Sequence, residues 1–586
     1  MSQRMPAVDN LQIARVFEEL AELMEFRGEN PFRIRAYQNG ARAIRDLDES
    51  VASILADESR DLAKVPGIGK TLVEKCAVLI QTGNLPQLTK LQMEIPEIVI
   101  LMSRIPGLGA KKAMRLHDEL AIQSLDDLRA ACTEDKISGL KGFGKKTQDS
   151  IFEGLAIAQA ASERLYWSKG DELASRISSH MDSCVAIRRK QWAGSYRRGR
   201  ETVGDLDLLV VVNEEQNRND VMDHFEAYPE TSQVIGRGDT KISIRVDRAF
   251  QVDMRVVLED EFGAALQYFT GSQAHNVHVR RLAKERGLKI NEYGVFRESD
   301  SAKIAGTTEE DVYDAIGLPW IPPELREDRQ EFLWATDGDL PELIKTDDVR
   351  GDLHMHTTAT DGQASMRQMA DEAIARGLQY IAITDHSQRV SMANGLDPNR
   401  LRAQWQEIDQ LRSEYEGRLM ILKGIECDIL ESGGMDLPDD VLAEGDWIIA
   451  SIHYGQKQPR DQITERILGA IENPHVDCVA HPTGRLINRR PPYDVDLETV
   501  MRSAAEHSTF MELNANPARL DLNDVQLATA KKIGVSLVIN TDAHSTEGLS
   551  VMRYGILQAR RGGLKPADVK NCMDWRDFSK LIAFST

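Results

Sequence analysis

Seven short apolar runs between residues 352 and 544 most constrain the fold of this chain. They are separated mostly by helical or loop stretches, and they are DLHMH (352–356), YIAITDH (380–386), MILKGIECDI (420–429), WIIASIH (447–453), VDCVAHP (476–482), TFMELN (509–514) and VSLVINTDAH (535–544). Repeated alternation of strands with helices predicts a parallel sheet or a barrel. We therefore expect a domain of this kind over residues 351–586.

Potential metal ligands gather in six of these runs, most of them at the C-terminal end. The donor set is His354, His356, Asp361, His386, Glu426, His453, His481, Asp542 and His544. Barrel enzymes place their chemistry at that end of parallel strands. Imidazole and carboxylate without thiolate suit Zn²⁺, Mn²⁺ or Fe²⁺. Nine donors exceed the need of one ion, so two or three metals are expected. Such a cluster activates water and neutralises a phosphoester, which predicts hydrolytic phosphoester cleavage.

A second acidic pattern lies in the stretch GSYRRGRETVGDLDLLVVV (194–212). Asp205 and Asp207 open an apolar strand and, two residues apart, share one face of it. A later run, FQVDMRVV (250–257), places Asp253 inside another strand. If the strands are neighbours, three carboxylates converge to hold two Mg²⁺ ions for phosphoryl transfer. Ser195 and Arg198 can hold phosphate oxygens beside them, which predicts nucleotidyl transfer from a nucleoside triphosphate.

The N-terminal third repeats one glycine pattern three times, as VPGIGKT (65–71), IPGLGAK (105–111) and LKGFGKK (140–146). The glycines permit a tight hairpin, and the helix that follows can hold a phosphate oxygen at its N-terminus. One copy alone is compatible with an ordinary helix connection, but three copies, each with a nearby lysine, favour binding to a nucleic-acid backbone. The glycines concerned are Gly67, Gly69, Gly107, Gly109, Gly142 and Gly144. A basic stretch, FRIRAYQNGARAIRDL (32–47), is either a solvated face or a phosphate-facing surface.

The net charge of −21 would by itself argue against a nucleic-acid partner. The charge is divided unevenly, however. Residues 1–200 carry 30 Lys and Arg against 27 Asp and Glu, whereas residues 201–586 carry 42 against 66. No apolar run approaches the ~18 residues that span a membrane. The N-terminus does not resemble a secretory signal, and the six cysteines form no CxxC pair. We expect a cytoplasmic protein without a membrane partner.

Residues 10–330 resemble the X-family DNA polymerases, the group that contains polymerase beta. The resemblance rests on the GS and GDLD motifs of the palm, on YFTGS (268–272), and on LKINEYGVF (288–296) and LPWIPPELRE (318–327). It implies that Asp205, Asp207 and Asp253 are catalytic ligands of Mg²⁺ or Mn²⁺. The triphosphate would contact Ser195, Arg198 and Gly204. The sugar and base would contact Tyr268, Phe269, Gly271 and Asn276, and DNA would contact Arg280. Arg255 and Glu292 resemble the family's conformational-switch pair.

Lys75 matches the Schiff-base lysine of the family's 5′-deoxyribose-phosphate lyase domain, and Tyr37 matches an associated tyrosine. A lysine nucleophile needs a lowered pKa, which burial or nearby cations provide. Arg33 and Thr71 stand where the family commonly has lysines. The alternative is that Lys75 is a solvated helix lysine.

The C-terminal runs resemble the polymerase-and-histidinol-phosphatase (PHP) domain. HMH, TDH, GIE, His453, AHP and TDAH match its motifs in order, with no ligand position substituted. The resemblance implies a distorted (β/α)₇ barrel and an active metal site. Arg485 in HPTGR is either a phosphate contact or a structural residue.

Together these features resemble the bacterial X-family DNA polymerases that carry a C-terminal PHP domain. The expected domains are a lyase-like helical domain (1–88), a fingers-like helical region with two helix–hairpin–helix motifs (89–160), an α+β nucleotidyltransferase palm (161–260), a thumb-like subdomain (261–320), a linker (321–350) and the PHP barrel (351–586).

The expected function is short-gap filling in base excision repair, with a metal-dependent 3′→5′ exonuclease in the barrel. 3′-Phosphatase, AP-endonuclease and lyase activities are compatible with the resemblance. The expected partners are gapped or primer–template DNA and deoxynucleoside triphosphates, and the expected state is a monomer. Two alternatives stay open, namely a small-molecule nucleotidyltransferase fused to a phosphatase and a non-catalytic DNA scaffold.

Overall fold

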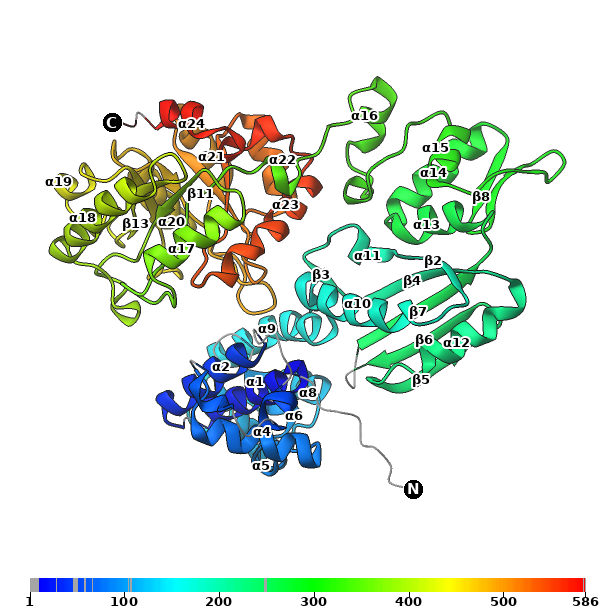
Figure 1. Cartoon of the computed structure of the whole chain (residues 1–586), viewed down its shortest axis with the longest axis horizontal. Coiled ribbons are helices and arrows are strands. Elements are labelled where there is room, and N and C mark those ends of the chain that lie inside the picture. Colours follow the sequence, from blue (N-terminus) through cyan, green and yellow to red (C-terminus); the bar gives the residue numbers. More distant parts are fainter. Residues whose placement is uncertain are drawn as a thin grey trace. The chain divides into compact units, whose positions relative to one another are not determined.

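The computed structural model describes residues 10–27, 29–45, 51–56, 60–65, 67–103, 105, 108–246, 250–582 and 584. The chain divides into two compact units, Met1–Ser162 and Glu163–Thr586 (Figure 1). None of the helices in the described part of the chain has the length and apolar character needed to cross a membrane.

The first unit is helical. Its elements are α1 (Asn10–Phe26), α2 (Pro31–Arg45), α3 (Val51–Ala56), η1 (Leu62–Lys64), α4 (Lys70–Thr82), α5 (Pro86–Glu94), α6 (Glu97–Ser103), α7 (Ala110–Leu120), α8 (Leu125–Thr133) and α9 (Lys145–Glu163). Two separate hydrophobic cores hold these helices together. One core runs from Ile13 to Ile95 and the other from Ile98 to Leu155.

The second unit begins with the palm, a five-stranded sheet in the order β2-β4-β7-β6-β5. The palm elements are β1 (Leu165–Tyr166), α10 (Trp167–Asp182), β2 (Ile187–Trp192), α11 (Gly194–Arg197), β3 (Thr202–Val203), β4 (Asp205–Val212), η2 (Glu215–Asn217), α12 (Arg218–Glu226), β5 (Thr231–Arg237), β6 (Lys241–Val246) and β7 (Phe250–Val257). Strands β4 and β7 are parallel, and the other pairs in this sheet are antiparallel.

Strand β4 is buried on both faces. Its even-numbered side chains, such as Leu208 and Val210, pack in one core with α10 and α12. Its odd-numbered Leu209 and Val211 pack in another core with the helix that follows the sheet. Because side chains alternate along a strand, Asp205 and Asp207 share the face of Leu209 and Val211.

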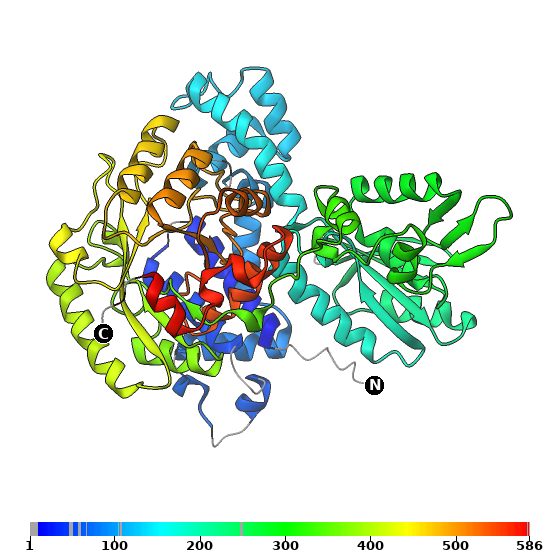
Figure 2. The same cartoon turned by 90° about the horizontal axis from the view of Figure 1, so that it is seen from above.

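A thumb-like subdomain follows the palm sheet. It comprises α13 (Phe262–Thr270), α14 (Gln273–Glu285), β8 (Leu288–Asn291), β9 (Gly294–Arg297), β10 (Lys303–Ala305) and α15 (Glu309–Ala315). In Figure 2 the palm strands and the thumb helices form one module, coloured from cyan to green.

The segment expected to be a linker, 321–350, is more extensively folded than predicted. It forms η3 (Pro323–Leu325), α16 (Glu331–Asp337) and η4 (Thr346–Asp348). Leu325, Phe332 and Leu343 join the core of the thumb. Its apolar residues are spaced too irregularly to predict this packing from the sequence.

The barrel confirms the seven predicted strands. They lie in chain order as a seven-stranded parallel sheet of β11 (Gly351–Asp352), β12 (Tyr380–Ile383), β13 (Met420–Asp428), β14 (Trp447–Ser451), β15 (Cys478–Val479), β16 (Phe510–Asn514) and β17 (Leu537–Asn540). A parallel bridge between Met355 and Ala543 brings the chain after β11 and β17 together. The sheet is therefore nearly closed.

Helices surround this sheet. They are α17 (Met366–Ala375), α18 (Pro398–Glu414), α19 (Asp439–Leu442), α20 (Arg460–Ile471), α21 (Leu497–His507), α22 (Asp524–Ile533), α23 (Met552–Arg561) and α24 (Trp575–Leu581), with short helical turns η5 (Ser391–Ala393), η6 (Glu547–Val551), η7 (Pro566–Asp568) and η8 (Lys570–Cys572). The ring of Phe578 on α24 stacks on Tyr380, the first residue of β12, with 4.9 Å between ring centroids. This contact closes the N-terminal end of the barrel and leaves the C-terminal ends of the strands for the site.

Candidate functional sites

The three palm carboxylates come together as the sequence predicts. Strands β4 and β7 are adjacent and parallel, and their register places Asp207 opposite Asp253. Gly194 lies so close that a Cβ there would be 2.4 Å from Oδ2 of Asp207, which explains why the GSYRRG loop begins with glycine. Ser195, the next residue, thus lies beside the carboxylates.

Electrostatic repulsion is strong in this cluster. Burial, together with the charges of Asp205 and Asp253, raises the pKa of Asp207 to about 7. Burial and Asp253 also raise the pKa of Asp205. Burial opposes ionisation of Asp253 too, but hydrogen bonds from Lys241 (2.5 Å) and Gln251 (2.8 Å) lower its pKa. Three buried carboxylates fit divalent cations as a further counter-charge, beside Lys241 and the nearby arginines.

Two arginines flank the carboxylates. Nε of Arg198 donates to Glu327 (3.0 Å) and its Nη1 donates to the carbonyl of Thr270 (2.7 Å). Arg164, which the sequence analysis did not single out, donates through Nη2 to the carbonyl of Thr202 (2.6 Å). A Cβ on Gly204 would lie 3.0 Å from Nη1 of Arg164. The sequence around residue 164 did not predict this role, because Arg164 directly follows the long helix α9 and belongs to no motif.

The predicted sugar and base contacts surround the start of α14. Asn276 donates through Nδ2 to the carbonyls of Tyr268 (2.6 Å) and Gly271 (3.3 Å). A Cβ on Gly271 would lie 2.5 Å from Oδ1 of Asn276. The guanidinium of Arg255 lies over the ring of Phe269, 4.5 Å from its centroid. Among the described residues Arg255 makes no ion pair with Glu292.

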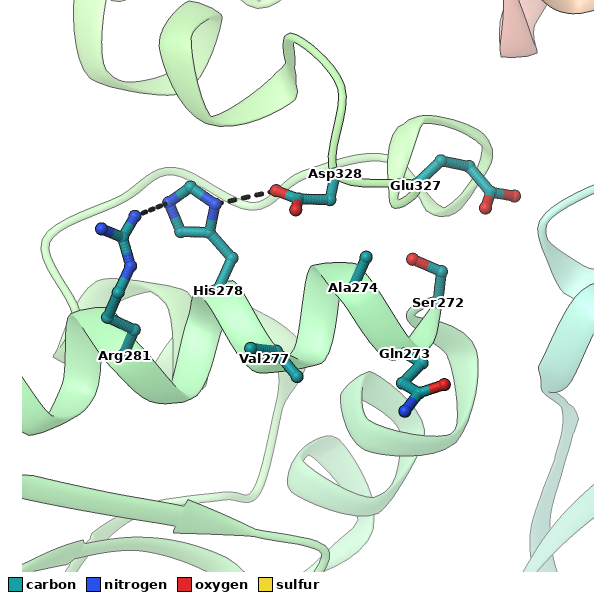
Figure 3. A pocket seen from close by; sticks show the side chains of 8 residues that line it. All are labelled: Ser272, Gln273, Ala274, Val277, His278, Arg281, Glu327 and Asp328. Atoms are coloured by element: carbon teal, nitrogen blue, oxygen red, sulfur yellow. Dashed lines mark hydrogen bonds and ion pairs between the residues drawn. The ribbon is translucent and has the colours of Figure 1, made fainter.

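Helix α14 borders a groove of about 670 Å³. Figure 3 shows Arg281, His278 and Asp328 in a row along it. Arg281 donates to Nε2 of His278 (2.9 Å), so Nδ1–H of His278 donates to Asp328 (2.8 Å). Val277 on the same wall is 51% exposed, and Arg280 beside it is also exposed. The helix therefore presents an apolar and basic surface to solvent.

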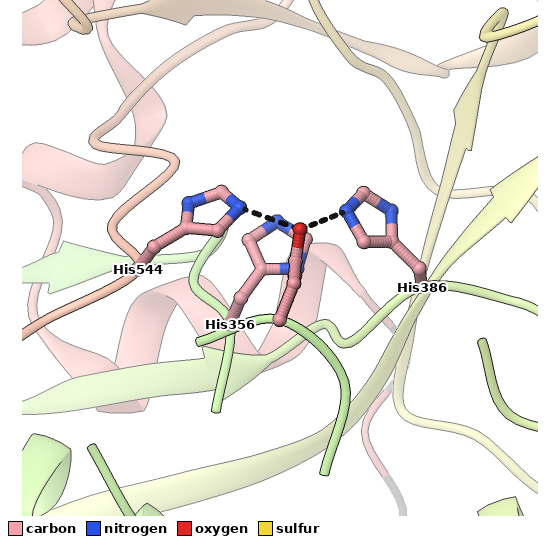
Figure 4. A group of neighbouring side chains, drawn as sticks. His356, His386 and His544 are labelled. Atoms are coloured by element: carbon pink, nitrogen blue, oxygen red, sulfur yellow. Dashed lines mark ion pairs between the residues drawn. The ribbon is translucent and has the colours of Figure 1, made fainter. Parts of the chain in front are cut away.

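The nine predicted donors of the barrel converge at the C-terminal ends of its strands. Three overlapping groups have their donor atoms within 4.8 Å of one another, namely His356, Asp361, His386 and His544; His354, His356 and Asp542; and His386, Glu426 and His453. His481 completes the set, with Nε2 3.0 Å from Oε1 of Glu426. In Figure 4 the rings of His386 and His544 flank His356, and both make ion pairs of 3.5 Å with Asp361.

The donor set fits metal ions. Among the buried atoms without a hydrogen-bond partner are Nε2 of His354, both ring nitrogens of His356 and Oε2 of Glu426. Unpartnered buried polar atoms are rare unless they serve a ligand. Burial and the neighbouring imidazoles of His544 and His386 lower the pKa of His356 to about 3, so its ring is neutral, as a metal ligand must be.

Glu512 is a functional residue that the sequence analysis missed. Its carboxylate is fully buried and accepts hydrogen bonds from Nδ1 of His354 (2.7 Å) and from the backbone N–H of His481 (2.8 Å). The first bond fixes the tautomer of His354 and turns Nε2 toward the site. Asp428 holds the backbone of His453 in the same way (2.8 Å). The sequence did contain one indication of this role. Glu512 is the single charged residue in the apolar run TFMELN, and a buried charge needs a partner.

A cavity of about 360 Å³ leads to the donors. Its wall includes Met392, which is 86% exposed, and Arg519, whose Nε lies 3.5 Å from Asp542. Arg485, considered above as a phosphate contact, instead forms an ion pair with Glu201 (2.6 Å) and does not line this cavity. The structure thus favours its structural role.

Lys75 lies in a polar cluster of the first unit. Its Nζ donates to Oε1 of Gln87 (2.6 Å) and lies 5.8 Å from the centroid of the Tyr37 ring. Burial, aided by the charge of Arg33, lowers the pKa of Lys75. The side chain is half-buried, which distinguishes it from a fully solvated helix lysine.

The glycine turns share one backbone geometry. In each turn the apolar residue donates to the carbonyl three positions earlier, as in Ile68 to Val65 (3.0 Å), Leu108 to Ile105 (3.0 Å) and Phe143 to Leu140 (2.9 Å). Gly67 and Gly142 have φ of 89° and 86°, which favours glycine. Gly107 lies outside the described residues. In each copy the second glycine, Gly69, Gly109 or Gly144, directly precedes a helix.

Comparison with known proteins agrees with this architecture. Family models match a helix–hairpin–helix domain (8–85), a SAM-like helix–hairpin–helix tandem (99–156), the DNA polymerase beta thumb (265–327) and the PHP domain (352–515). The chain is 42% identical to the DNA polymerase/3′-5′ exonuclease PolX of Bacillus subtilis, over 97% of this chain and 98% of that protein. It is 26% identical to DNA polymerase lambda of Rattus norvegicus, over 54% and 56% of the two chains. It is also 34% identical to a probable phosphatase of Thermoanaerobacter, over 33% of this chain and 78% of that protein.

Fold and site together define a nucleotidyltransferase of the X-family architecture joined to a PHP domain. At this level of identity over nearly its whole length, the chain belongs to the PolX family of DNA polymerases.

Proposed function

We propose that this chain is a DNA-directed DNA polymerase that fills short gaps during base excision repair, with a metal-dependent 3′→5′ exonuclease in its barrel. The observation that carries the proposal is the presence of two clusters of metal-binding side chains, three aspartates in the palm and a histidine–carboxylate cluster in the barrel. The substrates are gapped or primer–template DNA and deoxynucleoside triphosphates. We infer that the protein acts as a cytoplasmic monomer.

In the palm, Asp205, Asp207 and Asp253 would hold Mg²⁺ or Mn²⁺. Bound there, such ions would supply charge neutralisation for the triphosphate and the primer 3′-hydroxyl during nucleotidyl transfer. Ser195, Arg198 and Gly204 hold the triphosphate, and Arg164 adds a further positive charge near Gly204. Tyr268, Phe269 and Gly271 support the sugar, and Asn276 contacts the base.

In the barrel, the nine donors would hold two or three Mn²⁺, Zn²⁺ or Fe²⁺ ions. Bound there, such metals would supply water activation and charge neutralisation for hydrolysis of a phosphodiester. Arg519 at the wall of the cavity binds a phosphate oxygen of the DNA. Glu512 and Asp428 keep His354 and His453 oriented. 3′-Phosphatase and AP-endonuclease activity would use the same centre.

The three glycine turns and the exposed Arg280 would bind the DNA backbone without reading its sequence. This feature favours DNA over a small-molecule acceptor, and the match to a polymerase beta thumb supports the same choice.

A lyase step is a second candidate activity, carried by the environment of Lys75. An amine with a lowered pKa is neutral more often at neutral pH, so it can attack the C1′ aldehyde of a 5′-deoxyribose phosphate. Gln87 and Tyr37 would orient it.

The test is primer extension on one-nucleotide-gapped DNA and degradation of a labelled 3′ end, each in Mg²⁺ and in Mn²⁺. We expect Asp205→Ala with Asp207→Ala to abolish extension and spare degradation. We expect His354→Ala with His356→Ala to do the reverse. Extension by the double aspartate variant would refute the palm assignment, and degradation by the double histidine variant would refute the barrel assignment.

A further inference from the structure

One helix of the barrel packs directly on the phosphate-binding loop of the palm. Leu557 of α23 lies so close to Gly199 that a Cβ there would be 2.3 Å from Cγ of Leu557. The next residue, Gln558, donates to Glu201 (2.8 Å), and near the start of the helix Arg553 pairs with Asp171 (3.0 Å). One face of α23 therefore follows the GSYRRGRE stretch.

Arg561, at the last turn of α23, contacts Arg198 in two ways. Its Nη1 donates to the backbone carbonyl of Arg198 (2.9 Å). The same nitrogen donates to Oε1 of Glu327 (3.0 Å), the oxygen that also accepts from Nε of Arg198 (3.0 Å). Arg561 thus holds the backbone of Arg198 directly and its side chain through a shared carboxylate.

These contacts are buried. The side chain of Arg561 is 2% exposed, that of Glu327 9% and that of Arg198 12%. Nη2 of Arg561 also donates to Asp524 (2.6 Å), which fixes the guanidinium from the barrel side. Buried, charge-assisted hydrogen bonds of this kind define side-chain geometry closely.

The contacts leave one nitrogen of Arg198 available. Nε is used by Glu327 and Nη1 by the carbonyl of Thr270. Nη2 makes no hydrogen bond to any described residue. If Arg561 were absent, Glu327 would keep two cations, Arg198 at Oε1 (3.0 Å) and Arg200 at Oε2 (3.5 Å), and the carbonyl of Arg198 would lose its donor. The guanidinium could then turn toward Glu327 and away from the nucleotide.

We propose that Arg561 of the barrel is a positioning residue for nucleotide addition, which holds the phosphate-binding Arg198 of the palm in place. This inference rests on the proposed function, in which Arg198 binds the triphosphate. It makes the barrel part of the polymerase site. The opposite side of α23 packs behind the barrel site, where Gly555 lies against Ala515 and Ile539.

The experiment measures single-nucleotide incorporation in the full chain as a function of nucleotide concentration. We expect Arg561→Gln to raise the nucleotide KM about 5- to 20-fold and to change kcat less than threefold, because a misplaced Arg198 weakens binding to the triphosphate. Arg561→Lys keeps the charge but cannot donate in two directions from a planar group, so its KM should lie between those of the wild type and the Gln variant.

Arg560→Gln is the matched control. Arg560 is the neighbour of Arg561 on α23 and pairs with Glu324 (2.7 Å), so this change also breaks a contact between barrel and thumb without touching Arg198. Its nucleotide KM should stay within twofold of wild type. Exonuclease activity on single-stranded DNA should stay within twofold in all three variants, which shows that the barrel remains folded.

The variants distinguish a failure of phosphate binding by Arg198 from a failure of the positioning role of Arg561. If Arg198→Gln leaves the nucleotide KM unchanged, the phosphate-binding assignment fails and this inference fails with it. If Arg198→Gln raises KM but Arg561→Gln behaves like Arg560→Gln, this inference alone is refuted. If Arg561→Gln does not fold, Arg561→Lys decides, and a wild-type KM in that variant overturns the proposal.

Discussion

Replacing Glu512 by glutamine tests the claim that this buried carboxylate sets the barrel site. The wild-type side chain accepts from Nδ1 of His354, from the backbone of His481 and from the amides of Asn514 and Asn540. An amide has one accepting oxygen in place of two and an NH₂ that would face one of these donors. The bonds at one of the two oxygens must therefore be lost. When the NH₂ takes the place of Oε1, it faces Nδ1–H of His354, which then loses its fixed orientation.

The size of the effect follows from the geometry. His354 touches two other donors, with Nε2 3.6 Å from Glu426 and 3.7 Å from Asp542, so its misorientation disturbs a shared ion. Loss of such an outer partner typically costs about 10- to 100-fold in metal affinity or activity, or about 1.4–2.8 kcal/mol. We expect this loss in exonuclease rate at limiting Mn²⁺, with partial recovery at high Mn²⁺.

The assay is degradation of a 3′-labelled single strand over a Mn²⁺ titration, with primer extension as an internal control. Glu506→Gln, an exposed change on α21, is the matched variant and should behave as wild type. An unchanged Mn²⁺ dependence in Glu512→Gln would refute the role of Glu512. Equal loss of extension would point to a general folding defect.

Three further predictions concern other parts of the chain. Arg33 helps to lower the pKa of Lys75, so Arg33→Gln should raise that pKa. Borohydride trapping should then need a higher pH, and an unchanged pH profile argues against Arg33 as a cause. Gly199→Ala should destabilise the protein by about 1–3 kcal/mol more than Gly338→Ala in thermal unfolding. Both glycines have positive φ, but the new Cβ would collide with Leu557 at residue 199 and meets open space at residue 338. Arg519→Gln should raise the KM for DNA in the exonuclease assay several-fold and leave extension unchanged; an unaltered KM would exclude the phosphate contact.

The metal-binding site of the barrel was predictable because its ligands lie at the ends of the strands. Parallel strands bring their C-terminal ends to one edge, so His356, His386 and Asp542 converge although they are far apart in sequence. The palm was predictable for a similar reason, since Asp205 and Asp207 share one strand face and Asp253 is on the next strand.

The contacts of Arg198 were not predictable from the sequence. Its partners Glu327 and Arg561 are 129 and 363 positions away, and no periodic pattern connects them. Arg485 shows the same limit. Its place in a metal-site motif suggested a phosphate contact. It pairs instead with Glu201, because the packing of the palm against the barrel brings the two residues together.

The acidic excess of residues 201–586 has a structural consequence beyond metal binding. Glu327 and Asp524 are only 9% and 12% exposed, and each pairs with an arginine across the thumb–barrel contact, Glu327 with Arg561 and Asp524 with Arg329. Breaking a buried pair by removing one partner costs about 3–5 kcal/mol, because the remaining charge stays buried. Loss of Arg561 would remove one partner from both carboxylates at once while they stay buried. These carboxylates therefore join the barrel to the polymerase module, which agrees with the single compact unit formed by Glu163–Thr586.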